Sequence, residues 1–208
     1  MRREKRDGFL KIGLFGGTFD PIHNGHIKVA QAAKNNLQLD KVILIPAGDP
    51  PHKAGKNLSD KMHRLDMARL AAEPLGAEVS DWELLQTGKS YSVDTVRHFQ
   101  ATCPRDELFF IIGADSFYDI PTWWHYRELL ELCSFVVVAR PDTDKNKLLA
   151  KYAGDEKPPR VFYLQDILVD ISSTAIRDKV RRGEDISTLV PPAVQDYIHS
   201  HKLYTCGG

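Results

Sequence analysis

Residues 10–26 read LKIGLFGGTFDPIHNGH, and this stretch contains a predicted strand, a glycine-rich loop and the start of a predicted helix. Its first part, LKIGLF at positions 10–15, is a short apolar run that predicts a strand, and residues 26–37 predict a helix after it. Gly16 and Gly17 allow a tight turn and a close approach of the backbone to a ligand, because they carry no Cβ. A helix start offers free N–H groups and a positive dipole end, so this strand–loop–helix unit predicts a phosphate site.

Short apolar runs alternate with amphipathic stretches along the rest of the chain. Strands that are apolar on both sides and are spaced by helices indicate a parallel sheet covered on both faces. We therefore expect an α/β fold: a doubly wound parallel sheet with a small C-terminal helical portion. The predicted strands are residues 10–15, 42–46, 77–80, 108–112, 135–139 and 161–164, and the predicted helices are 26–37, one capped by Ser59 that reaches about Glu73, 92–100, 127–133, 173–182 and 192–201.

The length of 208 residues predicts one domain, residues 1–208. Residues 1–8 are expected to be a flexible N-terminus and residues 172–204 to form the helical portion. Residues 47–57 and 154–159 are expected to be mobile loops. Ligands of doubly wound sheets bind beyond the carboxyl ends of the strands, so we expect the site there.

Composition narrows the class of protein. Lys plus Arg equals Asp plus Glu, 28 each, which argues against a protein that mainly wraps nucleic acid. The three cysteines include no C-x-x-C pair, so neither a disulfide framework nor a zinc site is expected, and a reducing compartment fits. No apolar run approaches a membrane span, and no apolar stretch follows the charged start MRREKRD as in a signal peptide. We expect a cytoplasmic protein that binds neither membrane nor nucleic acid.

His23 and His26 are three residues apart around the predicted helix start, so they can face the same side. Two imidazoles aimed at one phosphate can donate hydrogen bonds to charge that builds in a transition state. A metal-binding pair is the alternative, but no third ligand is evident nearby. Gly25, placed just before the helix, permits another close approach of the backbone. The segment matches neither a P-loop nor a dinucleotide-binding G-x-G-x-x-G.

A second candidate phosphate site lies far downstream, in the sequence ISSTAIR at residues 171–177. Hydroxyl side chains at a helix start provide caps and lie beside free N–H donors. Arg177 is one turn beyond Ser173 and can reach a phosphate with a planar fork of donors. A plain capped surface helix is the alternative reading. Two phosphate-binding helix starts in one chain favour one triphosphate held between them.

The string G-x-F-D-P-x-H-x-G-H resembles the signature of the H-x-G-H nucleotidyltransferase superfamily, which implies a Rossmann-like nucleotidyltransferase fold. The resemblance implies that His23, His26 and Arg177 are catalytic and contact ATP phosphates. It further implies that ATP is bound by Gly16, Gly17, Thr18, Phe19, Gly25, Gly113, Asp115, Ile171, Ser172, Ser173 and Thr174. Asp115 is alternatively a helix N-cap, or it helps to hold Mg²⁺.

One branch, the bacterial nicotinate mononucleotide adenylyltransferases, is similar over residues 10–204. The motifs GGTFDPIHNGH, PAGDPPHK, SYSVDTV, IIGADS, P-x-W-W, VVVARP and DISSTAIR occur in the expected order. The resemblance implies transfer of AMP from ATP to nicotinate mononucleotide with Mg²⁺, giving deamido-NAD and pyrophosphate in NAD biosynthesis. The branch commonly has Thr where this chain has Ser92, and Tyr where it has Trp124.

The resemblance also implies an acceptor pocket. Trp123 would stack on the cationic pyridinium ring, and residue 124 would make a main-chain contact. Ser92 and the helix start beside it would bind the nicotinate carboxylate. His52, Lys53 and Arg140 would bring positive charge to the phosphates. The alternatives are half-buried anchors for Trp123 and Trp124, a solvated loop for Lys53 and a surface salt bridge for Arg140.

Three other readings remain open from sequence. The acceptor could be nicotinamide mononucleotide, which differs by one charge on the ring substituent, or phosphopantetheine. The chain could instead be a nucleotide-binding regulator without turnover, although the intact histidine pair and Arg177 speak against this. The sequence leaves a homo-oligomer open.

Overall fold

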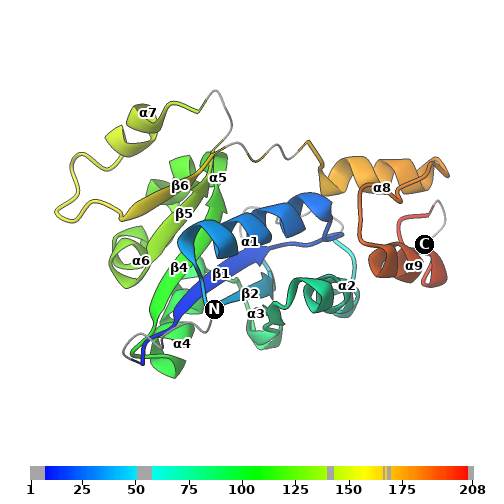
Figure 1. Ribbon diagram of the computed structural model, residues 1–208, viewed down its shortest axis with the longest axis horizontal. Helices are drawn as coiled ribbons and strands as arrows, with labels where there is room; N and C mark the ends of the chain where they lie inside the picture. Colours follow the sequence, from blue (N-terminus) through cyan, green and yellow to red (C-terminus); the bar gives the residue numbers. More distant parts are fainter. Residues whose placement is uncertain (1–7, 51–57, 140–142, 166, 168–169, 206–208) are drawn as a thin grey trace, which may run out of the picture.

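The computed structural model describes residues 8–50, 58–139, 143–165, 167 and 170–205, and within them it contains a six-stranded parallel sheet (Figure 1). The order of the strands in the sheet is β3-β2-β1-β4-β5-β6. Neighbouring strands are parallel throughout, as the sequence predicts. The strands are β1 (Lys11–Gly17), β2 (Lys41–Pro46), β3 (Glu78–Val79), β4 (Glu107–Gly113), β5 (Ser134–Val138) and β6 (Val161–Leu164). This order confirms the doubly wound, Rossmann-like sheet.

The helices of the described residues cover both faces of this sheet or lie beside it (Figure 1). They are α1 (Asn24–Leu37), α2 (Lys61–Leu75), α3 (Trp82–Leu85), α4 (Ser92–Thr102), α5 (Ala114–Asp119), the 3₁₀ helix η2 (Ile120–Thr122), α6 (Tyr126–Leu132), α7 (Lys145–Ala150), α8 (Ser173–Arg181) and α9 (Pro192–Ser200). Helices α3, α5 and α7 are not among the helices predicted from the sequence. They have four to six residues, too few for a helical pattern of apolar residues to be visible.

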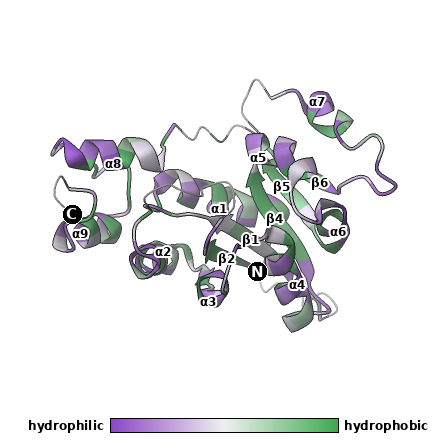
Figure 2. Cartoon of the chain, turned by 180° about the vertical axis from the view of Figure 1, so that it is seen from behind, coloured by the Kyte–Doolittle hydropathy of each residue, from purple (hydrophilic) through white to green (hydrophobic). Residues whose placement is uncertain are grey.

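Two hydrophobic cores lie on opposite faces of the sheet. Strand β4 contributes to both: Phe109 and Ile111 join the core with α1 and α2, while Phe110 and Ile112 join the core with α4 and α6. This double burial explains why β4 is a continuous apolar run. Figure 2 shows the hydrophobic residues gathered in the strands and the hydrophilic ones on outer helices such as α7 and α8.

The C-terminal helical portion lies beside α1 and α2 rather than over the sheet (Figure 1). Ile176 of α8 and Val194 and Ile198 of α9 are buried and belong to the same core as α1 and α2. Tyr197 of α9 donates a hydrogen bond to the Asp66 carboxylate of α2 at 3.1 Å. Helix α9 therefore packs against α2, and both of the last helices share the core that contains α1 and α2.

Three predicted helix starts are wrong by one or two residues, and one of them is that of α6, which begins at Tyr126 instead of Arg127. Helix α1 begins at Asn24 instead of His26, so Gly25 lies inside its first turn and is buried. Helix α2 is capped by Asp60 instead of Ser59, because the Asp60 carboxylate accepts the N–H of Met62 at 2.7 Å. Within the described residues, no helix has the length and apolar character needed to cross a membrane.

Leu14 tests the core around the central strand. It is fully buried in β1, so we expect Leu14→Ala to lower the free energy of unfolding by about 2–5 kcal/mol through lost contacts and a residual cavity. Leu85 of α3 is 72% exposed, and we expect Leu85→Ala to change the free energy of unfolding by no more than about 0.5 kcal/mol. Guanidinium unfolding of both variants measures the difference. Equal losses of stability in the two variants would contradict the burial of Leu14 in this core.

Candidate functional site

A cavity of about 630 Å³ opens at the carboxyl ends of β1 and β4. These two strands are neighbours where the strand order reverses, which is where doubly wound sheets bind ligands. The cavity is lined by Phe15, Gly16, Gly17, Thr18, Ala47, Pro50, Glu83, Ser90, Tyr91, Ser92, Phe110, Ile111, Ile112, Gly113, Ser116, Thr122, Trp123, Trp124 and His125. Predicted ATP-binding glycines and predicted acceptor residues therefore share one cavity.

The glycines at this cavity differ in the space that a side chain would meet at their positions. A Cβ on Gly16 or Gly113 would meet no atom within 4 Å, so both leave open space for a ligand. A Cβ on Gly17 would lie 2.6 Å from the Phe19 ring. Phe19 is itself buried, and its ring packs edge-on against His26 at a centroid distance of 5.1 Å. The Phe19 side chain therefore supports His26, and only its backbone remains available to a nucleotide.

His23 and His26 lie together at the start of α1. His23 is the N-cap residue, and the two rings stack with centroids 3.6 Å apart. His26 Nδ1 accepts the backbone N–H of His23 at 3.2 Å, so in the neutral ring the proton is on Nε2. The His26 ring is also 6.0 Å from that of Phe15, which lines the cavity. The pair is thus placed beside the cavity, with the tautomer of His26 set by the backbone.

Burial keeps His23 neutral. It lowers the pKa of His23 to about 4, and the side chain is nearly inaccessible to solvent. Its Nδ1 faces the His26 N–H as in a capping box, yet this buried atom has no full hydrogen-bond partner among the described residues. A neutral imidazole can still donate one hydrogen bond from Nε2 to an approaching anion.

The start of α8 docks against the turn that precedes α1. Ser173 Oγ donates to the main-chain oxygen of Pro21 at 2.9 Å, and Arg177 Nη1 donates to that of Asp20 at 2.7 Å. Ser172 caps α8 by accepting the N–H of Ala175. The two predicted phosphate motifs, about 150 residues apart, therefore meet in space, which a plain capped surface helix would not require.

The opposite wall of the cavity comes from α4 and the segment before α6. Ser92 is the first residue of α4, and Trp123 is partly buried against the core that contains α4 and α6. Trp124 is 60% exposed, so the alternative that it is a half-buried anchor is wrong. Its ring lies 6.0 Å from that of Tyr91. Two aromatic faces and a helix start are thus available to a planar, charged ligand.

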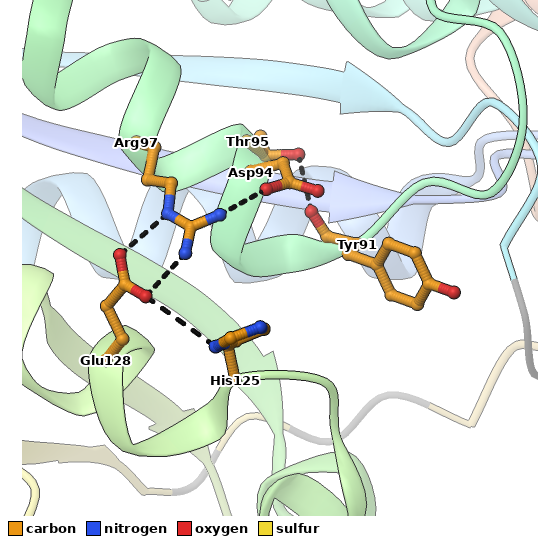
Figure 3. Close-up of polar contacts among 6 residues, drawn as sticks. All are labelled: Tyr91, Asp94, Thr95, Arg97, His125 and Glu128. Carbon is orange, nitrogen blue, oxygen red and sulfur yellow. Dashed lines mark hydrogen bonds and ion pairs between the residues drawn. The ribbon is translucent and has the colours of Figure 1, made fainter.

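An ion-pair network holds this wall together (Figure 3). Arg97 of α4 donates to both carboxylate oxygens of Glu128 on α6 and to Asp94 at 2.7 Å. These partners raise the pKa of Arg97, and Arg97 lowers the pKa of Glu128. His125 Nδ1 lies 3.9 Å from Glu128, at the cavity side of the same network. The bidentate pair joins α4 to α6, the helix that follows Trp123 and Trp124.

The comparisons agree with this geometry. Residues 14–179 match the family model described as "Cytidylyltransferase-like". The "Probable nicotinate-nucleotide adenylyltransferase" of Citrifermentans bemidjiense is 42% identical, covering 94% of this chain and 98% of the relative. The protein of the same name from Clostridium tetani is 41% identical, covering 93% and 98%. The chain belongs to the nicotinate-nucleotide adenylyltransferase family.

A solved structure supports the fold of this family member. The Plasmodium falciparum nicotinic acid mononucleotide adenylyltransferase complexed with NaAD superposes with a TM-score of 0.77 at 20% identity. The superposition covers 94% of this chain and 97% of that one. At this identity the likeness shows that the two chains share a fold.

Arg64 is a buried residue of the site that the sequence analysis does not single out. Its Nη1 donates to the main-chain oxygens of Thr18 at 3.0 Å and Ala47 at 2.7 Å, which joins the loops after β1 and β2. Burial lowers the pKa of Arg64, and the charge of Asp20 counteracts this. An arginine on the core-facing stripe of α2, in line with Ala68 and Ala71, is the sequence signal that could have revealed it.

Glu83 is a second such residue. It lines the cavity, accepts the Thr95 hydroxyl at 2.6 Å and faces the N–H of Gly48 at 3.4 Å. Burial raises the pKa of Glu83, and these hydrogen bonds act in the opposite direction. It connects the segment after β2 to α4. Its helix α3 is too short to be read from sequence, which is why Glu83 carries no visible signal.

Four predicted site residues are not among the described residues that line the cavity or form the two phosphate motifs. Asp115 is exposed in the first turn of α5, whose N-cap is Gly113, so the alternative that Asp115 is an N-cap is wrong. His52, Lys53 and Arg140 lie outside the described residues. In the part of the chain that is described, no group of three or more His, Cys, Asp or Glu side chains could hold a metal ion.

The burial of His23 predicts a loss of stability in acid. Because its pKa falls from 6.5 to about 4 on folding, the unfolded chain takes up a proton in a pH range where the folded chain does not. We expect this group alone to lower the free energy of unfolding by about 2 kcal/mol between about pH 7 and about pH 4.5, measured by urea unfolding.

His23→Gln should remove this part of the pH dependence. His199→Gln, at an exposed position of α9, should leave it in place and serves as the control. If His23→Gln unfolds with the same pH dependence as the parent protein, His23 is not buried as described.

Proposed function

We propose that this protein transfers the adenylyl group of ATP to nicotinate mononucleotide, forming deamido-NAD and pyrophosphate as a step in NAD biosynthesis. The observation that carries the proposal is the contact between the two phosphate motifs, made by Arg177 and Ser173 on the turn at Asp20 and Pro21. The names of the relatives, which are 41–42% identical, support the choice of acceptor.

ATP is assigned to the β1 side of the site. Its phosphates would lie between the starts of α1 and α8, whose N–H groups and positive dipole ends favour negative charge. His23, His26 and Arg177 are the proposed catalytic donors. Gly16, Gly17, Thr18, the Phe19 backbone, Gly25, Gly113, Asp115, Ile171, Ser172, Ser173 and Thr174 form the proposed remainder of the ATP site.

The acceptor is assigned to the cavity wall built by α4 and by the segment that contains Trp123 and Trp124. The pyridinium ring would stack on Trp123, and the carboxylate would face Ser92 and the N–H groups at the start of the 11-residue helix α4. Trp124 would contribute a main-chain contact. His52, Lys53 and Arg140 are the proposed ligands of the phosphates.

The reaction is a direct displacement at phosphorus. A phosphate oxygen of the mononucleotide attacks the α-phosphorus of ATP, a new P–O bond forms, and the bond to the leaving pyrophosphate breaks. A phosphate monoester is mostly ionised near neutral pH, so the protein needs neither a nucleophile nor a strong base. His26 donates from Nε2 and Arg177 from its fork to the developing charge, so that catalysis consists of positioning and charge stabilisation.

Nucleotidyltransferases of this family generally use divalent metal ions, and Mg²⁺ is the proposed ion. Because the described residues contain no cluster of three or more metal-ligating side chains, it would be held chiefly by the triphosphate oxygens. When bound, Mg²⁺ would neutralise charge on the leaving pyrophosphate.

The wider setting is also a proposal. The activity is assigned to one domain, residues 1–208, with residues 172–204 as its C-terminal helical portion. Residues 1–7 of the expected N-terminal segment lie outside the described residues. A cytoplasmic location is proposed, with ATP and nicotinate mononucleotide as the partners, without nucleic acid or membrane. A homo-oligomer is compatible with this reading.

Pyrophosphate release with ATP and Mg²⁺ tests the function. We expect nicotinate mononucleotide to be preferred over nicotinamide mononucleotide and phosphopantetheine as the acceptor. A preference for one of the other two would overturn the assigned acceptor, and ATP binding without turnover on all three would favour a regulator.

Trp123→Ala tests the acceptor wall. We expect it to raise the KM for the mononucleotide about tenfold, with the KM for ATP changed by less than about twofold, because stacking on a cation contributes about 1–2 kcal/mol. Trp82 stacks on His98 and lies outside the cavity lining, so Trp82→Ala is the matched control. Equal effects of the two substitutions would contradict a stacking role for Trp123.

A further inference from the structure

Asp20 occupies the junction of the two phosphate motifs. It lies in the turn between β1 and α1, three residues before His23, and its main-chain oxygen accepts Arg177 Nη1 at 2.7 Å. The residue is almost fully buried, at 2% exposure. Any movement of Asp20 would therefore shift the histidine pair and the arginine relative to each other.

The Asp20 carboxylate is satisfied from two distant parts of the chain. One oxygen accepts the N–H of Ser59 at 3.3 Å, and the other accepts the hydroxyl of Tyr204 at 2.7 Å. The phenol comes from 184 residues away. A buried carboxylate that loses a donor is costly, so the phenol contributes directly to keeping this turn in place.

Tyr204 is held in position as a permanent donor. Burial, followed by the charge of Asp20, raises the pKa of Tyr204, so the phenol keeps its proton under physiological conditions. The backbone adopts left-handed φ angles of 52° at Lys202 and 64° at Tyr204. Non-glycine residues adopt this backbone conformation only at a cost in conformational energy. Contacts with the surrounding structure must therefore hold the chain on the path that brings Tyr204 to Asp20.

We propose that Tyr204 is a positioning residue for adenylyl transfer, acting through Asp20 on the alignment of His23, His26 and Arg177. The inference rests on the proposed function. Tyr204 is not among the residues that line the cavity. It fixes the turn from which the motifs are aligned, and small displacements of catalytic donors reduce stabilisation of the transition state more than binding of the ground state.

If Tyr204 only anchored the C-terminal helical portion, loss of another anchor of that portion would have the same effect. Tyr197 provides this control. Tyr197 also lies in the C-terminal helical portion, and its hydroxyl also donates to a carboxylate, that of Asp66 on α2 at 3.1 Å. Among the described residues, the Tyr197 hydroxyl bonds to Asp66 and His63 and not to the Asp20 turn. Tyr197→Phe therefore removes an equivalent anchor of the same segment without touching the junction.

The test compares Tyr204→Phe and Tyr197→Phe in the full chain, with ATP, Mg²⁺ and nicotinate mononucleotide. We expect Tyr204→Phe to lower kcat by about tenfold to a hundredfold, with both KM values within about threefold of the parent. Tyr197→Phe should keep kcat within about twofold. An unchanged kcat in Tyr204→Phe, or equal losses in both variants, would overturn the proposal.

Hydrogen exchange gives a second readout that does not require turnover. We expect the amides of residues 22–27 to exchange about tenfold faster in Tyr204→Phe than in Tyr197→Phe at equal global stability. Equal exchange in the two variants would overturn the positioning role. If the parent protein releases no pyrophosphate, the proposed function is contradicted. If the two variants still differ in exchange as expected, the role of Tyr204 in holding the turn remains supported.

Discussion

One hydrogen bond, from Arg177 Nη1 to the main-chain oxygen of Asp20, joins two segments 157 residues apart at the site. The bond from Ser173 Oγ to Pro21 runs beside it. Without these contacts, the histidine pair would lie at one helix start and the arginine at another, and each alone would be an ordinary anion site. Together they form one region in which several donors can stabilise the spread charge of a triphosphate.

The parallel sheet determines where this region can form. β1 and β4 are neighbours and their connections leave in opposite directions, so the loops at their carboxyl ends diverge and leave the cavity open. Polar groups that are buried behind these loops hold them in place. Arg64 joins the loops after β1 and β2, and Asp20 is close enough to offset part of the effect of burial on Arg64. Such buried charges require partners, so the loops have little freedom to rearrange.

Much of the fold could be predicted, because strands buried on both faces are continuous apolar runs. The first phosphate motif could also be predicted, because few other functions would explain the sequence of residues 16–26. The sequence could not show that the Phe19 ring fills the space beside Gly17, because the interpretation of a glycine depends on which neighbours approach it. It also gave no sign of the Tyr204–Asp20 contact, since pairing over 184 residues leaves no local pattern. Short elements such as α3 were missed because four residues are too few to show a helical pattern, and Glu83 was missed with α3.

The most direct test of the account is a double-mutant cycle on kcat between His26→Ala and Arg177→Ala. If both residues act on one triphosphate, each substitution lowers kcat by about a hundredfold, and the double variant loses less than the product of the two by at least about tenfold. Arg181→Ala, on the same helix but paired with Asp178, should combine with His26→Ala additively. Independent, multiplying effects of His26→Ala and Arg177→Ala would contradict the claim that the two motifs form one catalytic site.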